Sequence, residues 1–143
     1  MDNLTKFAEV LQDLLIEHNT NPFAFSKSAD IHYNIVYNWL NKKSLPSLKK
    51  LVFLSDYFEC SIDYLLGRTL DNYYSKKLIT PFAVQLRKLI DNQNISAYKL
   101  SAKIEIPDSN LSRFLRGESE PLLDNLIKIA DYFGCSVDYL VGR

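Results

Sequence analysis

The amino-acid sequence predicts an all-α protein that contains two similar five-helix units. Apolar residues recur at helical spacing, as in the series Phe7, Leu11 and Leu14. The pattern then repeats, because residues 7–68 align with residues 82–143 without a gap and over a third of the aligned pairs are identical. Ordinary amino-acid usage would give about 6% identity by chance. The two units therefore form an internal repeat, and each is close to the lower size limit for a domain that folds by itself.

The first copy, residues 1–68, is predicted to contain five helices. An apolar stripe that begins at Phe7 predicts the first helix, and Asn21 is placed to cap the second. Ser61 is placed to cap the last helix, and Gly67 to end it. The four helices after the first are predicted over residues 22–29, 32–41, 48–58 and 61–66.

The second copy, residues 81–143, repeats this order. Its first helix is predicted from a stripe that begins at Phe82, with Thr80 as the N-cap and Pro81 as the first helical residue. The later helices are predicted over residues 96–104, 107–116, 123–133 and 136–141. Two of them have a serine placed as the N-cap, at Ser96 and Ser136.

Residues 69–80 (TLDNYYSKKLIT) are predicted to connect the two copies. The segment is not a Gly/Ser-rich tether, and four of its residues are expected to form a small apolar face: Leu70, Tyr73, Tyr74 and Leu78. We therefore expect a short, partly ordered connector that restricts the relation between the units.

Composition and charge argue against several classes of protein. Lys plus Arg and Asp plus Glu both number 17, so no overall positive field indicates nucleic acid or a membrane. Neither a cleavable apolar leader nor a run of bilayer length is recognisable, which predicts a cytoplasmic protein without membrane attachment. A nucleophile–base pair, paired carboxylates and a phosphate-binding glycine loop are not recognisable either, so we expect no enzymatic activity and no cofactor.

The cysteines and histidines show no metal-ligand spacing, and no metal site is expected. Cys60 and Cys135 occupy matching positions and are expected to act as small buried hydrophobes rather than as a disulfide. Trp39, which matches Phe114, is expected to pack inward. His32 is expected at the surface, where it also stands in position to cap the helix that follows.

Two stretches carry a resemblance to a known family. Residues 100–142 read LSAKIEIPDSNLSRFLRGESEPLLDNLIKIADYFGCSVDYLVG, and residues 25–67 read FSKSADIHYNIVYNWLNKKSLPSLKKLVFLSDYFECSIDYLLG. The first is very similar to the Cro and phage-repressor helix-turn-helix domains (the XRE-like family), and the second resembles them more loosely. The resemblance implies a lambda-repressor-like fold in both copies, in which one helix braces a second helix that enters the major groove of DNA.

Both copies depart from the family pattern around the second of these helices. Asp30 and Glu105 replace the usual glycine of the turn before it. Asp tolerates a left-handed backbone better than Glu, so we expect strain or a varied turn. The glycine that often ends the recognition helix is retained as Gly117 but is Lys42 in the first copy.

The resemblance also implies which residues meet DNA. Base edges are expected to be read by Tyr33, Asn34, Ile35 and Asn38 in the first copy, and by Asp108, Ser109, Asn110 and Arg113 in the second. Asn can bond an adenine edge and Arg a guanine edge, whereas Ile can pack on a thymine methyl. Phosphate contacts are expected from Asn21, Asn41, Lys42, Lys43, Ser44, Lys49 and Lys50 in the first copy, and from Ser96, Arg116 and Ser119 in the second.

The two reading faces differ, although the packing residues are similar. At the outward positions of the two recognition helices, no matched pair is identical. Residues 42–50 (KKSLPSLKK) carry four lysines and no acid, whereas the matching residues 117–125 (GESEPLLDN) carry three acids and no base. We expect the first copy to supply more of the nonspecific affinity, and the second to add selectivity or to bind something else.

The sequence therefore predicts a repressor-like transcriptional regulator that binds double-stranded DNA, with different half-sites for the two copies. One chain with two copies supplies both reading helices covalently, and the sequence leaves open whether it also forms a homodimer. No small-molecule effector is implied. The alternative is a protein-interaction module, such as an antitoxin or a phage-type modulator, in which one or both units bind a protein partner.

Overall fold

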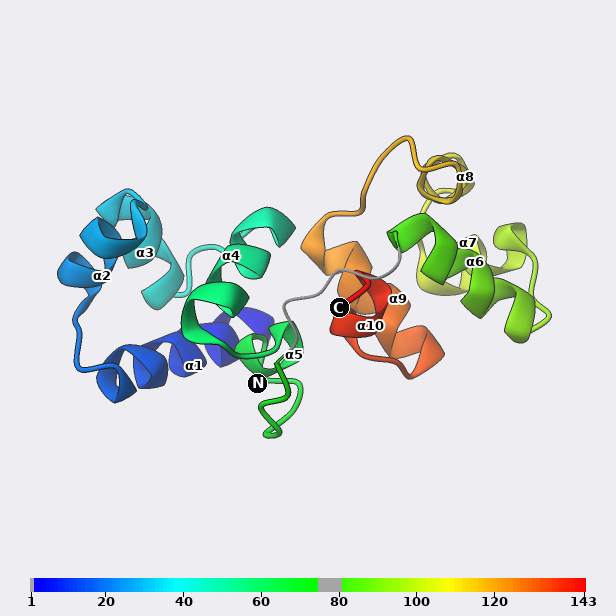
Figure 1. Cartoon of the computed structure of the whole chain (residues 1–143). Coiled ribbons are helices and arrows are strands. Elements are labelled where there is room, and N and C mark those ends of the chain that lie inside the picture. The colour runs from blue at the N-terminus through cyan, green and yellow to red at the C-terminus, as the bar shows by residue number, and fades with distance from the viewer. Residues whose placement is uncertain (1, 75–80) are drawn as a thin grey trace. The chain divides into compact units, whose positions relative to one another are not determined.

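The computed structural model describes residues 2–74 and 81–143, and these residues form ten α-helices and no strand (Figure 1). The all-α prediction is therefore confirmed for the described part of the chain. The chain divides into two compact units, Met1–Ser75 (unit 1) and Lys76–Arg143 (unit 2), and each contains five of the described helices.

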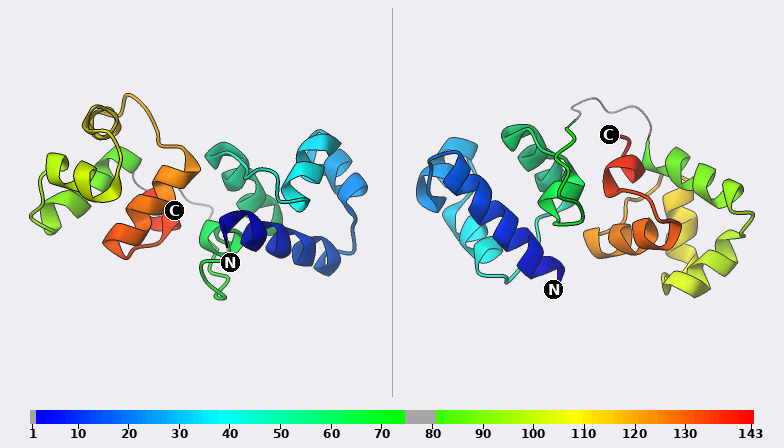
Figure 2. Two further views of the ribbon diagram at one scale, coloured as in Figure 1. Left: turned by 180° about the vertical axis from the view of Figure 1, so that it is seen from behind. Right: turned by 90° about the horizontal axis from the view of Figure 1, so that it is seen from below.

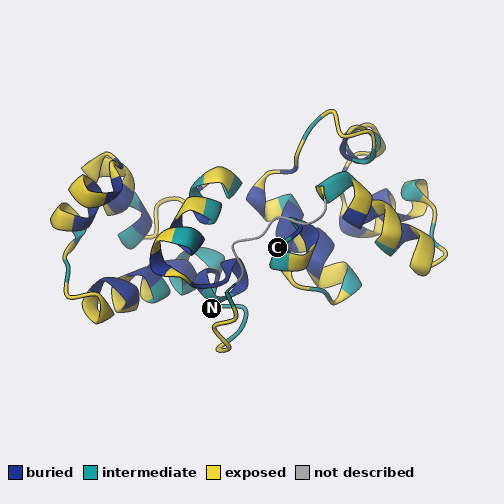
Figure 3. Ribbon diagram, in the orientation of Figure 1, coloured by how far each residue is buried: buried dark blue, intermediate teal, exposed yellow. Residues whose placement is uncertain are grey.

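The helices of unit 1 are α1 (Asn3–Glu17), α2 (Pro22–Ala29), α3 (Tyr33–Leu40), α4 (Leu48–Phe58) and α5 (Ile62–Leu65). Helix α1 packs against α3 and α5, α2 packs against α3, and α4 packs against α5 (Figures 1 and 2). The inward faces are apolar. They are buried, as the dark blue stretches of the ribbon in Figure 3 show. Phe7 on α1 meets Trp39 on α3 edge to face, with 6.0 Å between ring centroids. Trp39 thus packs inward, as predicted.

The helices of unit 2 are α6 (Phe82–Asn92), α7 (Ala97–Ile104), α8 (Asp108–Leu115), α9 (Leu123–Phe133) and α10 (Val137–Leu140). Helix α6 packs against α8 and α10, and α7 packs against α8 and α9. Phe82 on α6 meets Phe114 on α8 edge to face at 6.2 Å, which is the counterpart of the Phe7–Trp39 contact. The Nε2 of Gln85 donates to the carbonyl oxygen of Tyr139 (3.0 Å) and links α6 to α10.

Left-handed backbone positions match between the two units. In the described residues each unit has five positions with positive φ, and each has its counterpart 75 residues along the chain: Asn19/Asn94, Asp30/Glu105, Lys42/Gly117, Glu59/Gly134 and Gly67/Gly142. Such positions cost an L side chain about 1 kcal/mol or more, and they lie where helices end. The turns therefore follow one pattern even where the residue types differ.

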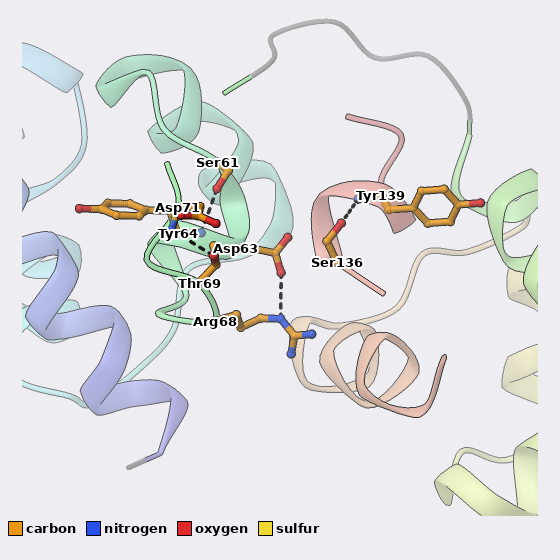
Figure 4. A network of polar contacts seen from close by, with 8 residues as sticks. All are labelled: Ser61, Asp63, Tyr64, Arg68, Thr69, Asp71, Ser136 and Tyr139. Carbon is orange, nitrogen blue, oxygen red and sulfur yellow. Dashed lines mark hydrogen bonds and ion pairs between the residues drawn. The ribbon is translucent and has the colours of Figure 1, made fainter. Parts of the chain in front are cut away.

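The predicted caps of four helices are confirmed. Asn21 and Ser96 accept hydrogen bonds from the backbone N–H groups of Ala24 (2.8 Å) and Lys99 (3.1 Å). Ser61 and Ser136 accept hydrogen bonds from Tyr64 (3.0 Å) and Tyr139 (2.9 Å) in the same way (Figure 4). Each cap satisfies an N–H that has no partner within the helix.

The predicted start of α6 is wrong by one residue. Pro81 stands at the N-cap rather than at the first helical position, and the helix begins at Phe82 without a side-chain cap. Pro81 has an extended backbone (ψ 150°), so it precedes the helix instead of opening it. The predicted cap, Thr80, lies outside the described residues.

Polar contacts hold the last described residues of unit 1 in place. The Nε of Arg68 donates to the Oδ1 of the buried Asp63 (2.8 Å; Figure 4). The residues after it lie against unit 1, because Asn72 accepts from the N–H of Ser61 (3.2 Å) and Tyr74 donates to Asp56 (2.9 Å). The first half of the predicted connector is thus ordered by polar contacts.

The apolar face predicted for the connector does not form over its described residues. The side chains of Leu70 and Tyr73 are exposed, with Leu70 97% accessible to solvent. Leu78, the fourth residue of the predicted face, lies outside the described residues.

Cys60 is buried, as predicted, whereas Cys135 is only half-buried, and neither forms a disulfide. No helix in the described residues has both the length and the apolar character needed to span a bilayer.

Candidate nucleic-acid interface

Helices α7 and α8 form a tight helix-turn-helix in unit 2. Glu105 ends α7 in a left-handed conformation (φ 56°), and the N–H of Ile106 donates to the carbonyl of Ser101 (3.2 Å). Ile106 is buried in the turn, and α8 packs through the buried side chains of Leu111 and Phe114. These apolar contacts set how α8 crosses α7, and they direct the opposite face of α8 outward.

Helices α2 and α3 form the same arrangement in unit 1. Asp30 is left-handed at the matching position (φ 55°), and the N–H of Ile31 donates to Ser26 (2.9 Å). The buried residues of α3 are Val36 and Trp39. Both turns therefore place a residue other than glycine in the left-handed conformation, and the backbone strain expected at Asp30 and Glu105 is present.

Most predicted base-reading residues lie on the outward faces of α3 and α8. Six of the eight are exposed: Tyr33, Asn34, Ile35, Asp108, Ser109 and Arg113. Asn38 and Asn110 are half-buried. The outward face of α8 is polar, whereas the outward face of α3 carries two tyrosine rings and an isoleucine.

Several predicted phosphate contacts of unit 1 already have local hydrogen bonds. The Oδ1 of Asn21 caps α2, and the Nδ2 of Asn41 donates to the carbonyl of Tyr37 (2.8 Å). Lys42, Lys43 and Ser44 are exposed in the turn after α3. Lys49 and Lys50 lie in the first turn of α4, where Lys49 is exposed and Lys50 is half-buried. The lysines, rather than the asparagines, are the groups free to meet phosphates.

In unit 2 the main predicted phosphate contact is engaged within the protein. The guanidinium of Arg116 donates to both carboxylate oxygens of Glu118, at 3.0 and 3.2 Å. This pair raises the pKa of Arg116 and lowers the pKa of Glu118, because the hydrogen bonds and the opposite charges favour both ionised forms. Ser96 is used as a cap and Ser119 is half-buried. Unit 2 therefore offers phosphates fewer groups than the sequence indicates.

The charge around the two helix-turn-helix elements has opposite sign. Residues 21–50 contain five lysines and one aspartate, whereas the matching residues 96–125 contain four basic and five acidic residues. The helix-turn-helix segment of unit 1 thus carries a net positive charge, and that of unit 2 carries a slight net negative charge.

Unit 1 also carries an exposed group of rings and lysines that sequence reasoning did not bring together, although it named Tyr33 and Lys43 as separate DNA contacts. Phe23 on α2 meets Tyr33 on α3 at 5.9 Å between centroids, and Tyr33 meets Tyr37 at 6.0 Å. The Nζ of Lys27 lies 4.7 Å from the centroid of Phe23, and the Nζ of Lys43 lies 5.8 Å from that of Tyr37. We call these five residues the aromatic strip. The signal was present in the sequence, since Phe23 and Lys27 lie four residues apart on one face of the bracing helix.

His32 lies at the surface and caps α3, and both features were expected from the sequence. Its Nδ1 accepts a hydrogen bond from the N–H of Asn34 (3.1 Å), and its side chain is exposed. The described residues contain no cluster of His, Cys, Asp and Glu side chains that could hold a metal ion.

Comparison with known proteins identifies the second helix-turn-helix. Residues 86–140 match a protein family described as helix-turn-helix. The match begins within α6 and ends at the last residue of α10, so it covers α7, the turn and α8. No curated protein and no solved structure matches the chain. The match supports a DNA-binding helix-turn-helix in unit 2.

Proposed function

We propose that this chain is a transcriptional regulator of the repressor type that binds double-stranded DNA in a sequence-specific manner. The observation that supports it best is the exposed polar face of α8, which packs against α7 through its apolar face, within the residues that match the helix-turn-helix family. An α-helix can enter the major groove, and we propose that Arg113 bonds a guanine edge there. Cytoplasmic location and the absence of enzymatic activity belong to the same proposal.

Unit 1 is proposed to be a second helix-turn-helix domain of the same XRE-like kind. The five left-handed positions of unit 1 each have a counterpart in unit 2, and the Phe7–Trp39 contact matches Phe82–Phe114. Its cationic face supplies the nonspecific attraction to phosphates that unit 2 lacks. Because the reading faces differ, the preferred DNA site is expected to be asymmetric rather than palindromic.

The test begins with selection of preferred duplexes from a random pool by the full chain. Arg113→Ala should then weaken binding to the selected site by roughly 10- to 100-fold and relax the preference at one base pair, because an Arg–guanine pair contributes about 1–3 kcal/mol of discrimination. Arg87→Ala, at an exposed position of α6, removes the same type of charge and serves as the control. Equal losses in the two variants, or no enriched site, would contradict sequence reading by α8.

A protein partner for unit 2 is the second candidate function. It is favoured by the Arg116–Glu118 pair and by the acidic excess of residues 96–125, which reduce the attraction of unit 2 for phosphates. The salt dependence of duplex binding separates the two candidates. Retardation of duplex DNA that weakens steeply with salt supports DNA, whereas absence of retardation even at low salt supports the protein partner.

Homodimer formation is a separate part of the proposal. Repressor-type domains bind paired half-sites, and one chain with two units already supplies two reading helices. Sedimentation with and without the selected duplex decides between one chain and two chains per site.

A further inference from the structure

The aromatic strip of unit 1 is not part of the apolar core. Phe23, Tyr33 and Tyr37 are 56%, 38% and 46% exposed, whereas the core rings Phe25 and Trp39 are almost fully buried. Exposed aromatic rings in a continuous row lose favourable burial, and such a patch marks an interaction site. Folding of unit 1 therefore leaves the rings of the strip partly exposed and open to a partner.

The charge of the strip indicates what this partner carries. Lys27 and Lys43 stand at its two ends, and Lys42 is exposed beside Lys43. Asp30 is the only carboxylate between residues 21 and 50. Aromatic rings between cations are complementary to flat groups joined by negative charges, which is the chemistry of a nucleic-acid strand.

The same chemistry distinguishes a single strand from a duplex. A base pair in a duplex presents only its edge to the groove, because its faces are covered by the neighbouring pairs. Ring faces can stack only on bases that are unstacked and turned outward, as in a single strand. Hydrogen-bonding side chains such as Arg and Asn suit the duplex, and rings such as Phe23 and Tyr37 do not.

We infer that the aromatic strip of unit 1 binds single-stranded nucleic acid, with bases stacked on Phe23, Tyr33 and Tyr37 and with phosphates at Lys27 and Lys43. This activity goes beyond duplex reading and shares Tyr33 with it, so a single strand and a duplex compete for unit 1. Unit 2 lacks the strip, because the matching residues are Tyr98, Ala102, Asp108, Ser112 and Glu118.

The experiment measures the fluorescence anisotropy of a labelled oligothymidine of about 12 nucleotides with the full chain at low and moderate salt. A strand of the same length with abasic sugars keeps the phosphates and removes the bases. The expected result is binding to oligothymidine at least about tenfold tighter than binding to the abasic strand. Equal affinity for the two strands would show attraction by charge alone and would overturn the inference.

Single substitutions test whether oligothymidine binds at the aromatic strip. Phe23→Leu and Tyr37→Leu should each weaken oligothymidine binding by roughly tenfold and leave the abasic strand unchanged. Lys27→Gln should weaken both strands and lower the salt slope by about 0.7. The matched control is Tyr98→Leu, because Tyr98 is 73% exposed at the position of unit 2 that corresponds to Phe23. The same loss in Tyr98→Leu and Phe23→Leu would contradict a site on unit 1.

Duplex retardation measured on the same variants separates this inference from the proposed function. Failure to bind oligothymidine together with retention of duplex binding overturns the single-strand site and leaves the proposed duplex function standing. Binding of oligothymidine without duplex binding supports the strip and contradicts the duplex function.

Discussion

At the scale of single residues, the neighbouring Glu118 changes which groups the side chain of Arg116 can bind. Its guanidinium is directed to the carboxylate of Glu118, two residues along the chain, by two hydrogen bonds. Glu118 thereby occupies two of the N–H donors that the proposed function assigns to a phosphate, and it offsets the positive charge of Arg116. Lys43 of unit 1 matches Glu118, so the corresponding position there carries a positive charge instead.

Glu118→Gln is expected to strengthen nonspecific duplex binding several-fold and to steepen the salt slope by about 0.9, because one more phosphate is neutralised. The measurement is retardation of a random duplex over a range of salt concentrations. Glu120→Gln removes the same charge from the same exposed loop and is the control. If both variants change binding equally, net charge rather than release of Arg116 is responsible.

At the scale of helices, the ends of α4 and α9 use one backbone conformation with different residues. Glu59 ends α4 with φ 52°, and Gly134 ends α9 with φ 66°. A side chain on a left-handed residue is strained, whereas glycine is not. A Cβ added at Gly134 would meet no atom within 4 Å, so the backbone alone determines its cost.

Glu59→Gly is therefore expected to stabilise the protein by about 0.5–1 kcal/mol, and Gly134→Glu to destabilise it by about 1 kcal/mol. Both changes are measured as the free energy of unfolding in denaturant. Gly67→Ala should cost more than Gly134→Ala, because its Cβ would lie 2.8 Å from the Cβ of Lys6. Destabilisation by Glu59→Gly would mean that the glutamate side chain makes a contribution larger than the strain.

At the scale of the whole molecule, the two units have similar frameworks and opposite local charge. The closing phrases DYFECSIDYLLGR and DYFGCSVDYLVGR keep the capping serines and the buried apolar residues, which explains why they are nearly identical. The segments that face DNA in the proposal are under no such packing constraint. Their charges differ, so the units are expected to contribute differently to affinity and selectivity.

Reversing the charge at one matched position in each unit tests whether the two units contribute differently to DNA affinity. Lys49 and Asp124 occupy matching exposed positions in the first turns of α4 and α9. Lys49→Glu should weaken binding to all duplexes and flatten the salt slope by about 0.9, and Asp124→Lys should strengthen binding and steepen the slope. Retardation of random and selected duplexes at several salt concentrations measures both. If Lys49→Glu leaves the salt dependence of duplex binding unchanged, unit 1 is not the source of the nonspecific affinity.

The sequence by itself determined the helices, four of the caps, the repeat and the inward packing of Trp39. The caps depend on groups a few residues apart, such as Asn21 and the N–H of Ala24, and the helices depend on apolar periodicity. Local spacing and periodicity can both be recognised in the sequence. Even locally it misplaced Pro81 by one residue, because the fixed φ of proline is compatible with both positions and only ψ, here extended, separates them.

Only the tertiary structure decided which side chains from different elements meet. Phe23 reaches Tyr33 because the buried residues of the turn and of α3 set the crossing of α2 and α3, and Tyr74 reaches Asp56 because the chain folds back on unit 1. A side chain's neighbours depend on such crossings, which arise from the packing of the whole core and not from any short stretch of sequence. The spacing of Phe23 and Lys27 along one helix can be found in the sequence, but the contact that joins them to Tyr33 depends on how α2 and α3 cross.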